Sequence, residues 1–586
     1  MSSIKNILKL QNEHFSATMI LMWLWKVSKG NRTQASLNAI IGVLEVLVSL
    51  ACVWAMKFAI DKAQFHGSAN EIYIAVAILA SLYLLNMGLA ICGVWIRNIL
   101  GIKAQNRMQQ SMLDRILHSQ WSGKEKFHSG DILNRLELDV RNVISFITEV
   151  LPNVLSVGIL FIGAFCMLAS LNIGLAFVIV AIIPVAIAFS RIYMNKMRSY
   201  TKAVRISDSK VQSLLQETIQ HRMLIKTLEK DDAMIGRLDD TQSILRDQVR
   251  RKTKFSVASH FILNFGFLAG YLIAFLWGAI QLADGIITFG SMTAFLQLVN
   301  RIQNPARDIM KLAPQFVSVF TAAERLMELE DEQLEEQGDS IHFKSPCGIR
   351  FSQVDFRYED NRAILHDFTF DFAPGTCTAI MGETGSGKTT LIRLILALLH
   401  PQKGNVCIYN AKKEAEISPR TRCNLVYVPQ GNTLLSGTIR DNLYLGRLDA
   451  TDEELYEVLH QACADFVSEL PDGLDTKCGE GGAGLSEGQA QRIAIARALL
   501  REGSIILLDE ATSALDNITQ KKVSESLDGL KCTRIVIANR LSTVKHAGRI
   551  ICLDGGRIVE SGTYDELMAK DGFFANLVRY QQLDCD

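Results

Sequence analysis

The N-terminal 310 residues of this 586-residue chain contain six apolar runs, each long enough to cross a lipid bilayer as a helix. The apolar core of a bilayer is about 30 Å thick and requires roughly 20 apolar residues in a helix that crosses it. The runs span residues 36–60, 72–96, 150–170, 173–193, 257–281 and 288–309. We therefore predict an all-α membrane domain with six transmembrane helices.

The connections between these runs differ in length and in charge. Three are short, but the second-to-third and fourth-to-fifth connections are long and rich in Lys and Arg. Basic connections stay in the cytoplasm by the positive-inside rule, and an even number of spans leaves both termini there too. The long connections have a helical period, so their helices are expected to continue the membrane helices well beyond the bilayer. Such helices can carry a mechanical signal.

The composition changes after the last run. Apolar residues make up 49% of the whole chain, but beyond about residue 345 they occur as short strand-like stretches between Gly, Asp and Pro. A single hydrophobic core rarely exceeds about 250–300 residues, so at least two domains are expected. Near the start, "MILMWLWKVSKG" predicts an interfacial helix with Trp23 and Trp25 at headgroup level. The expected divisions are an N-terminal interfacial region (1–34), a transmembrane domain (35–313), a linker (314–347) and a soluble α/β domain (348–586).

Charge and cysteine content exclude some classes of function. The chain has 61 basic and 61 acidic residues, so nothing in the overall charge suggests nucleic acid as a partner. Its twelve cysteines form no C-x-x-C pair. This usage is typical of a reducing compartment, where cysteines are ordinary packing residues.

The stretch "MGETGSGKTT" (381–390) matches the phosphate-loop pattern G-x-x-x-x-G-K-[ST]. It follows the strand-like run "CTAI" and precedes the helical run "LIRLILALL", which is the order that the motif requires. Glycines let backbone N–H groups approach the phosphates, and the helix N-terminus adds positive potential. Lys388 is expected to reach the β and γ phosphates, and Thr389 to offer its hydroxyl to Mg²⁺. The residues expected to contact the nucleotide here are Gly382, Glu383, Thr384, Gly385, Ser386, Gly387, Lys388, Thr389 and Thr390.

About 120 residues further on, "SIILLDEATSALD" supplies a second acidic element. An apolar strand that ends in Asp509 can hold the Mg²⁺ shell, and Glu510 beside it can orient or deprotonate the attacking water. An acidic turn after a strand is unremarkable by itself. In a chain that also carries the phosphate loop, the pair indicates nucleotide hydrolysis.

Three further motifs resemble those of the ATP-binding cassette (ABC) proteins. "LSEGQ" (485–489) is similar to the family's signature L-S-G-G-Q, "YVPQ" ends in the Gln of its Q-loop, and "SALD" (513–516) looks like its D-loop. The resemblance covers nearly all of 348–580, and the six runs before it resemble ABC exporter half-transporters of the lipid-flippase and multidrug type. It implies an α/β P-loop cassette that follows a six-helix transmembrane domain and hydrolyses ATP with Mg²⁺. It also implies roles for Gln430 (metal and catalysis), Tyr358 (stacking on adenine), and Ser486, Gly488 and Gln489 (nucleotide contacts).

The family resemblance implies a two-chain machine. The cassette lacks a group that closes over the γ-phosphate, and in the family the signature at a helix N-terminus does this from the partner chain. A two-fold dimer is the simplest assembly. Coupling helices are expected near "SQWSGKEKFHSGD" and "QETIQHRM", where they would rest on the cassettes. ATP binding would close the cassettes and shift the membrane domain to an outward-facing state.

Two positions depart from the family pattern. Glu487 replaces the first signature glycine, and a modest effect is expected because its side chain can point outward. Asn539, in "IVIANRLSTV", stands where the family has the switch histidine that contacts the γ-phosphate and aligns Glu510. Asparagine donates a neutral hydrogen bond but carries no charge. Three interpretations remain open: a slow homodimer, the impaired half of a heterodimer, or a substitution introduced to trap ATP. The first is favoured because Glu510 is intact.

The transported molecule is the point that the sequence determines least. Polar residues lie at membrane depth or its edge, and such residues usually face a cavity because they are costly in lipid. Pairing between helices, or snorkelling at the helix ends, is an equal alternative for two of them, Lys57 and Arg97. A mixed cavity suits an amphiphile, which predicts ATP-driven export or lipid flipping in the bacterial inner membrane. The alternative is a regulatory half with little hydrolysis. The residues concerned are Glu45, Lys57, Arg97, His260 and Asn264.

Overall fold

The computed structural model describes most of the chain as two compact units. The first unit is Met1–Asp114 with Ser129–Asp331, and the second is Arg115–His128 with Glu332–Asp586. The structure describes residues 16–583 except Asn31, His66, 122–128, Asn172, Ser345, 359–362, 480–481, Ala483 and 539–543, and it gives no side-chain surroundings for 174–195 and 304–314.

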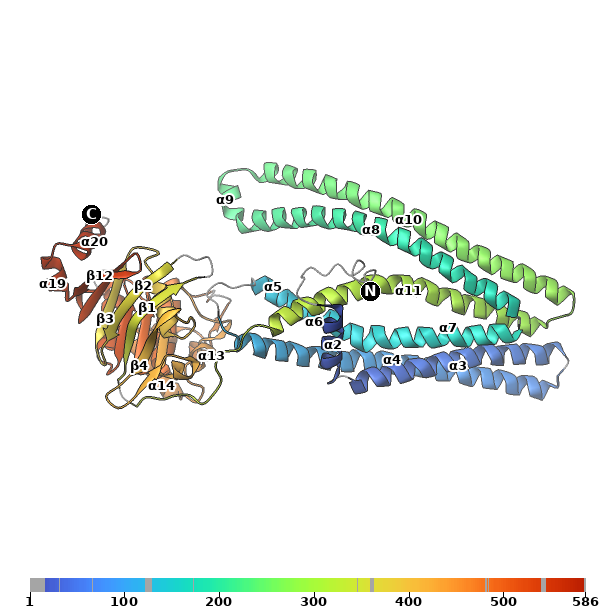
Figure 1. The fold of residues 1–586 in the computed structure, drawn as a ribbon, viewed down its shortest axis with the longest axis horizontal. Helices are drawn as coiled ribbons and strands as arrows, with labels where there is room; N and C mark the ends of the chain where they lie inside the picture. Colours follow the sequence, from blue (N-terminus) through green and yellow to red (C-terminus); the bar gives the residue numbers. More distant parts are fainter. Residues whose placement is uncertain are drawn as a thin grey trace. The chain divides into compact units, whose positions relative to one another are not determined.

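The first unit is built from α-helices, several of them far longer than a bilayer requires (Figure 1). Helix α4 has 49 residues, and at 1.5 Å per residue it is roughly 75 Å long, against a bilayer core of about 30 Å. The prediction that membrane helices continue into the long connections is therefore confirmed. The helices are α2 (Ala17–Ser28), α3 (Arg32–Gln64), α4 (Ala69–Leu117), α5 (Ser129–Asn134), α6 (Val140–Ser145), α7 (Leu151–Leu171), α8 (Ile173–Gln220), α9 (Arg222–Thr227), α10 (Asp231–Ala283) and α11 (Phe289–Glu330), with π-helical turns η1 (Arg135–Asp139) and η2 (Phe146–Val150).

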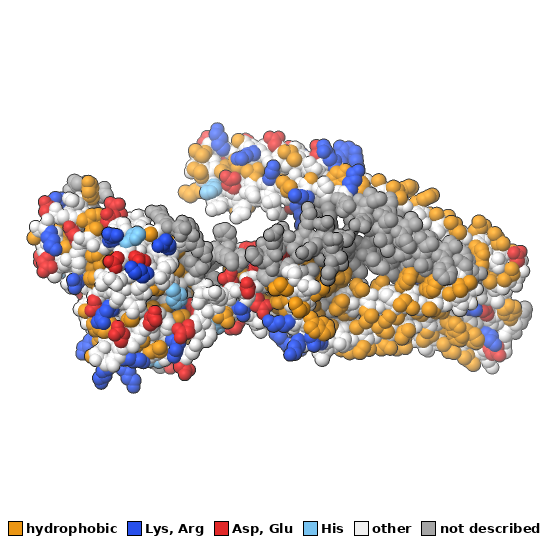
Figure 2. Space-filling model, in the orientation of Figure 1, with side chains coloured by type: hydrophobic (Ala, Val, Ile, Leu, Met, Phe, Trp, Pro, Cys, Tyr) orange, Lys and Arg blue, Asp and Glu red, His pale blue; other side chains and the backbone are white. Residues whose placement is uncertain are grey.

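Each of the six predicted apolar runs lies in a helix. In the part of the chain that the structure describes, four helices are long and apolar enough to cross a membrane: Arg32–Gln64, Ala69–Leu117, Gly130–Leu171 and Asp231–Ala283. The other two predicted runs lie in α8 and α11. Apolar side chains cover the outward face of α3 and α4 (Figure 2), as expected of helices that face lipid.

Small residues let the membrane helices pack closely. A buried cluster joins α3, α7, α10 and α11, with Val53, Leu168 and Leu298 at its centre. A Cβ placed on Gly290 of α11 would lie 2.6 Å from the backbone carbonyl oxygen of Lys57 in α3, so a larger residue would not fit at this approach. Close backbone contact of this kind drives helix association where lipid leaves no hydrophobic difference between inside and outside.

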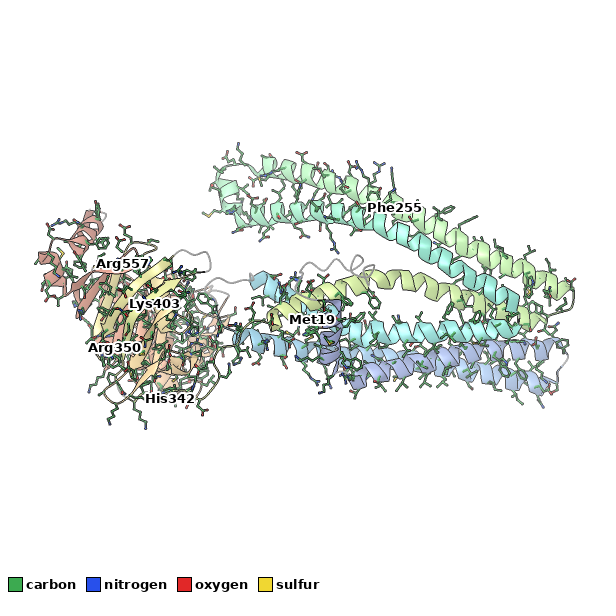
Figure 3. The ribbon with its side chains drawn as sticks, in the orientation of Figure 1. Met19, Phe255, His342, Arg350, Lys403 and Arg557 are labelled. Carbon is green, nitrogen blue, oxygen red and sulfur yellow. The ribbon has the colours of Figure 1, made fainter. Side chains whose placement is uncertain are left out.

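Helices α8 and α10 form a long hairpin whose tip is the short helix α9 (Figure 1). Tyr200 of α8 packs on Phe255 of α10, which Figure 3 labels, with ring centroids 5.5 Å apart. The ammonium of Lys196 lies 5.6 Å from the centre of the same Phe255 ring. These contacts tie the two helices together along the hairpin.

The last helix of the first unit extends beyond the predicted boundary at residue 313. Helix α11 continues to Glu330, so residues 314–330 are helical. Val319, Ala323 and Leu326 continue a buried stripe at helical spacing. Arg135 of η1 also pairs with Glu328 at 2.9 Å. The predicted boundary follows the end of the apolar run near 310, whereas packing within the unit keeps the chain helical to Glu330.

The second unit is an α/β domain with two main sheets. The antiparallel sheet has the order β2-β1-β4-β5, and the six-stranded sheet has the order β12-β11-β3-β10-β9-β6, in which only β12 runs antiparallel to its neighbour. The strands are β1 (Gly348–Arg357), β2 (Ala363–Phe372), β3 (Cys377–Gly382), β4 (Lys403–Tyr409), β5 (Glu414–Glu416), β6 (Leu425–Val428), β7 (Gly437–Thr438), β8 (Lys477–Cys478), β9 (Ile505–Asp509), β10 (Thr533–Ile537), β11 (Arg549–Asp554) and β12 (Arg557–Gly562).

Helices cover the parallel sheet, and its central strands are buried on both faces. Successive residues of β9 alternate between two cores: Ile505 and Leu507 enter one, and Ile506 and Leu508 enter the other. This explains the unbroken apolar run "IILLD", which is typical of parallel strands. The helices and helical turns are α12 (Lys388–Ile395), η3 (Pro419–Asn424), α13 (Ile439–Tyr444), α14 (Asp452–Gln461), α15 (Phe466–Glu469), η4 (Gly473–Asp475), α16 (Glu487–Leu500), α17 (Asn517–Asp528), α19 (Tyr564–Ala569) and α20 (Phe573–Leu583).

Candidate nucleotide site

Several of the predicted site residues lie at the carboxyl edge of the parallel sheet. In β10, Ile537 pairs with Ile380 of β3 on one side and with Asp509 of β9 on the other. Strand β3 then ends at Gly382, where the phosphate loop begins, and β6 ends two residues before Gln430. Ligands of open α/β sheets bind at this edge, outside the carboxyl ends of the strands.

Glycines set the shape of the phosphate loop, and the side chain of Lys388 bonds back to carbonyl groups of the loop. A Cβ on Gly382 would lie 2.3 Å from Leu553 O, so the loop could not pass here with a larger residue. Gly387 caps α12 with φ 106°, in the left-handed region. Lys388 Nζ donates to the carbonyls of Gly382 at 2.6 Å and Glu383 at 3.0 Å. The ammonium is therefore held at the mouth of the loop.

The hydrogen-bond donors of the phosphate loop suit a polyphosphate ligand. The first-turn N–H groups of α12 begin beside Gly387, and the ammonium of Lys388 lies with them. Ser386 is buried, and its Oγ has no hydrogen-bond partner among the described residues. Buried hydroxyls are normally bonded, so this one is available to a ligand. Thr389 is exposed on the first turn, whereas Thr390 is buried with Oγ1 3.3 Å from Tyr358 Oη.

Two adjacent carboxylates lie at the end of β9. Asp509 is 5% exposed, and its Oδ2 accepts a hydrogen bond of 3.3 Å from Tyr427 Oη. Glu510 has φ 50°, a left-handed conformation that is uncommon for glutamate. Its backbone N–H donates to Ile537 O at 3.2 Å, and its Oε2 accepts from Gln430 Nε2 at 2.7 Å. The structure thus brings together Gln430 and Glu510, as the sequence predicts.

The electrostatics of the edge follow from burial. Desolvation raises the pKa of Asp509 above the usual range of a carboxyl group, and it lowers the pKa of Lys388. The negative charges of Glu510 and Asp509 oppose the lowering at Lys388. Burial also raises the pKa of Tyr427, with the Asp509 charge adding to the effect. Burial therefore outweighs the attraction between Lys388 and the carboxylates, so the pKa shifts of Asp509 and Lys388 both favour the neutral forms.

The signature segment forms the N-terminus of α16. Ser486 is its N-cap: Ser486 Oγ accepts from Gln489 N at 3.2 Å, and Gln489 Oε1 accepts from Ser486 N at 2.8 Å. The Gln489 amide, predicted to contact nucleotide, is thus engaged in a capping box within this chain. Glu487 is exposed in the first turn, in agreement with the expected outward orientation. A Cβ on Gly488 would lie 2.9 Å from Ala514 O, so the signature is pressed against the D-loop.

Asn539 lies outside the described residues, and the described part of this segment ends at Ala538. The role assigned to it therefore rests on the sequence alone.

Four residues were not singled out by sequence analysis: Tyr427, Arg393 and Trp121 in the second unit, and Arg301 in the membrane domain. Tyr427 bonds Asp509, and its signal was its place in "YVPQ", three residues before Gln430. Arg393 of α12 donates from Nη1 to Tyr358 Oη at 3.2 Å, and its guanidinium lies 4.8 Å from the centre of the Trp121 ring. In the membrane domain, Arg301 of α11 donates to Ser49 Oγ of α3. An arginine inside a predicted apolar run was the available signal there.

Comparison with known proteins gives matches to both units. Residues 36–306 match the family model described as ABC transporter transmembrane region, and residues 365–513 match the model described as ABC transporter. An ATP-dependent lipid A-core flippase of Bordetella avium is 31% identical over 541 residues, which is 89% of each chain. A putative multidrug export ATP-binding/permease protein of Bacillus subtilis is 27% identical over 95% of this chain and 98% of its own length.

The fold also matches a solved structure. A bacterial Atm1-family ABC exporter with ATP bound superposes with a TM-score of 0.78 at 22% identity, over 94% of this chain and 99% of that chain. At this level of identity the likeness concerns the fold. It agrees with the predicted helical membrane domain followed by an α/β cassette.

Proposed function

The chain belongs to the ABC transporters and is an exporter, an integral membrane protein whose ATPase is coupled to transport, and from this premise we propose that it works as one half of a two-chain exporter of amphiphilic or lipidic molecules in the bacterial inner membrane. The observation that carries the proposal is the edge where Lys388, Asp509 and Glu510 converge. The names of the similar flippase and multidrug proteins, all of them bacterial, support the class of substrate and the membrane.

The residues of the site divide the work of ATP hydrolysis. Lys388 and the loop N–H groups bind the β and γ phosphates, where they stabilise the charge of the transition state. Glu510 accepts a proton from the attacking water, whose oxygen forms the new bond to the γ phosphorus as the bond to the β–γ bridging oxygen breaks. Gln430 holds the Glu510 carboxylate at 2.7 Å. The left-handed backbone of Glu510 keeps this carboxylate at the edge rather than in the sheet.

Oxygen ligands for Mg²⁺ are available at the same edge. We assign Thr389, Gln430 and Asp509 to hold the ion, since a hydroxyl, an amide oxygen and a carboxylate suit a hard cation. When bound, Mg²⁺ neutralises charge on the phosphate oxygens. Tyr427 orients Asp509 through its hydroxyl at 3.3 Å. Tyr358 is assigned to stack on adenine.

Removal of the Lys388 ammonium is the direct test of the phosphate loop. Lys388→Ala is expected to weaken ATP binding by about 10- to 100-fold, because hydrogen bonds to charged groups contribute roughly 1.5–3 kcal/mol. Transport should be lost with it. The measurement is ATP affinity of the purified chain in lipid, with Lys412→Ala, an exposed lysine in a turn, as the matched control. Wild-type affinity in Lys388→Ala would remove the phosphate loop from the nucleotide site.

The hairpin tip supports the two-chain assembly. Met223 of α9 is 83% exposed and Ile219 beside it is 72% exposed, so the hairpin tip presents apolar side chains. Leu224 and Leu228 extend this apolar tip. Exposed apolar clusters of this kind mark contact surfaces. We assign the tip to a cassette of the assembled exporter, where it would receive the movement that follows ATP binding. A homodimer is favoured over a heterodimer because Glu510 is intact.

The membrane domain supports a substrate with an anionic head group. Arg301 is half-buried among α3 and α11, and no carboxylate lies within ion-pair distance of it among the described residues. Arginine at membrane depth is costly, and it is kept where it serves a substrate or a cavity. Of the polar residues predicted to line a cavity, Glu45, Lys57 and Arg97 are half-buried, but His260 and Asn264 are exposed.

A matched pair of variants tests Arg301. Arg301→Met is expected to lower the stimulation of ATPase activity by an alkyl phosphate about 10-fold or more, as loss of a charged hydrogen bond implies. Arg301→Lys should retain most of the stimulation because it keeps the charge. A neutral alkyl glycoside of the same chain length is the control ligand. If both ligands stimulate Arg301→Met as they stimulate the wild type, the anionic class is wrong.

One observation favours a second function. Asn539 lacks the charge of the switch histidine, which suits a regulatory half whose own site hydrolyses little ATP. ATPase turnover of the single purified chain in lipid distinguishes the exporter homodimer from the regulatory half. Turnover near the background rate would favour the regulatory half, and steady turnover would favour the exporter homodimer.

A further inference from the structure

The connection after α4 is attached by backbone hydrogen bonds to the segment that follows α11, within the second unit. Gln120 N donates to Gln333 O at 2.8 Å, and Glu335 N donates to His118 O at 2.8 Å. Ser119 and Leu334 form an antiparallel bridge between these bonds. This short ladder fixes the backbone of the connection just before Trp121, so the indole has a defined place in the second unit.

Trp121 is packed against the cassette rather than exposed beside it. Its side chain is half-buried and contacts the same hydrophobic core that Tyr358 and Ile364 border. A cleft of about 450 Å³ lies beside it, and both Trp121 and Tyr358 line that cleft. The two rings are therefore held on one side and have room to move on the other.

One arginine contacts both rings. The Arg393 guanidinium lies 4.8 Å from the centre of the Trp121 ring, within the range of a cation–π interaction. Its Nη1 donates to Tyr358 Oη at 3.2 Å, and that hydroxyl is 3.3 Å from Thr390 Oγ1. Arg393 belongs to α12, the helix that starts with Lys388. The two rings and the arginine thus form one connected group beside the phosphate loop.

We propose that Trp121 and Arg393 are positioning residues for Tyr358, and that together they set the affinity of the site for the base of the nucleotide. This inference rests on the proposed ATP site. The guanidinium fixes the Tyr358 hydroxyl and with it the position of the ring on which a base stacks, while the edge-to-face contact with Phe356, at 5.0 Å between ring centroids, fixes the plane of that ring. Trp121 holds the guanidinium through its ring face. A movement of the connection that carries Trp121 would therefore change base binding without touching the phosphate contacts.

A ligand without a base separates this role from a merely structural one. Inorganic tripolyphosphate uses the phosphate loop but cannot stack on Tyr358. Trp121→Leu and Arg393→Met are each expected to raise KM for ATP about 3- to 10-fold, as loss of a cation–π contact or a hydrogen bond implies. The inhibition constant of tripolyphosphate should stay unchanged, and kcat should change less than KM.

Conservative and double variants complete the test. Trp121→Phe keeps an aromatic face and Arg393→Lys keeps the charge, so both should recover part of the ATP affinity. The double variant Trp121→Leu/Arg393→Met should be no worse than Arg393→Met alone, because both changes break one connected contact. Arg440→Met, at an arginine bound to Asp475 elsewhere in the cassette, is the matched control and should leave KM unchanged.

The outcomes distinguish this inference from the proposed function. No ATPase activity in the wild type would overturn the proposed ATP-driven exporter itself. Wild-type turnover with unchanged KM in both single variants would overturn only the positioning role. Equal weakening of ATP and tripolyphosphate would also overturn it, because the effect would then act through the phosphate loop. Additive effects in the double variant would show that Trp121 does not act through Arg393.

Trp121 also provides a direct signal. The chain has six tryptophans, and the other five, at 23, 25, 54, 95 and 277, precede the cassette in the first unit. The emission difference between wild type and Trp121→Phe therefore reports on the cassette. We expect that difference to change when Mg·ATP is added and to be insensitive to tripolyphosphate. A response to both ligands, or to neither, would contradict the proposal.

Discussion

Glu510→Gln is expected to lower the rate of ATP hydrolysis by about 10²- to 10⁴-fold, the usual contribution of a general base. Glutamine has the same shape, and its amide oxygen can still accept the hydrogen bond that Gln430 donates at 2.7 Å. The backbone bond to Ile537 is also unaffected, because it comes from the Glu510 N–H. What is lost is the capacity to take a proton from water. ATP binding should persist, and the closed dimer should accumulate.

Two measurements define this result. ATPase turnover in lipid should fall while ATP affinity stays within about twofold of the wild type, a pattern expected for an interaction that acts mainly in the transition state. Glu457→Gln, an exposed acidic residue on α14, is the matched control and should hydrolyse ATP normally. Unchanged turnover in Glu510→Gln would show that another group is the base.

Local patterns allowed much of the fold and the nucleotide site to be predicted. The phosphate loop, the acidic end of β9 and the cap of α16 are each encoded within about ten consecutive residues, since their geometry is set by glycine conformations, a buried strand and a helix N-terminus. The lengths of the six apolar runs likewise predicted helices, and all six runs lie in helices. In these cases the residues that determine the structure are sequence neighbours.

The features that could not be predicted depend on contacts distant in the sequence. From the sequence, the connection that carries Trp121 is assigned to the membrane domain. In the structure, the backbone N–H of Gln120 in this connection donates to Gln333 O, more than 200 residues away by sequence number. Nothing near Trp121 encodes that partner. Arg301 was likewise passed over because an apolar run is judged by its average, which one arginine hardly changes. Its partner Ser49 belongs to another helix.

Backbone strain is a further limit on prediction. The left-handed conformation of Glu510, with φ 50°, is not a preference of glutamate. It is held by the surrounding sheet, including the bond from Glu510 N to Ile537 O. Strain of this kind is retained at functional sites when neighbouring structure fixes it. The sequence could therefore single out Glu510 as the proposed catalytic carboxylate but could not predict its conformation.

Asn539→His is expected to raise ATP turnover, by up to about 10²- to 10³-fold, with little change in ATP affinity. A single preorganised donor in a transition state is worth roughly 3–4 kcal/mol, which sets the upper limit. Histidine would add a charge-capable donor to the γ-phosphate where asparagine offers a neutral one. Steady-state ATPase assays and ATP binding on the same preparation give the two quantities. A gain below about tenfold would mean that asparagine already serves well.

Asn539→Ala is the matched variant, because the interpretations of this position differ in what they predict for it. If Asn539 donates to the γ-phosphate in a slow but active homodimer, alanine should reduce turnover below that of the wild type and histidine should raise it. If the chain is the impaired half of a heterodimer, neither change alters turnover until the partner chain is added. If asparagine traps ATP, histidine should shorten the lifetime of the closed state. A histidine variant with unchanged turnover and unchanged closed-state lifetime would remove residue 539 from the switch position, because a group that contacts the γ-phosphate must alter at least one of them.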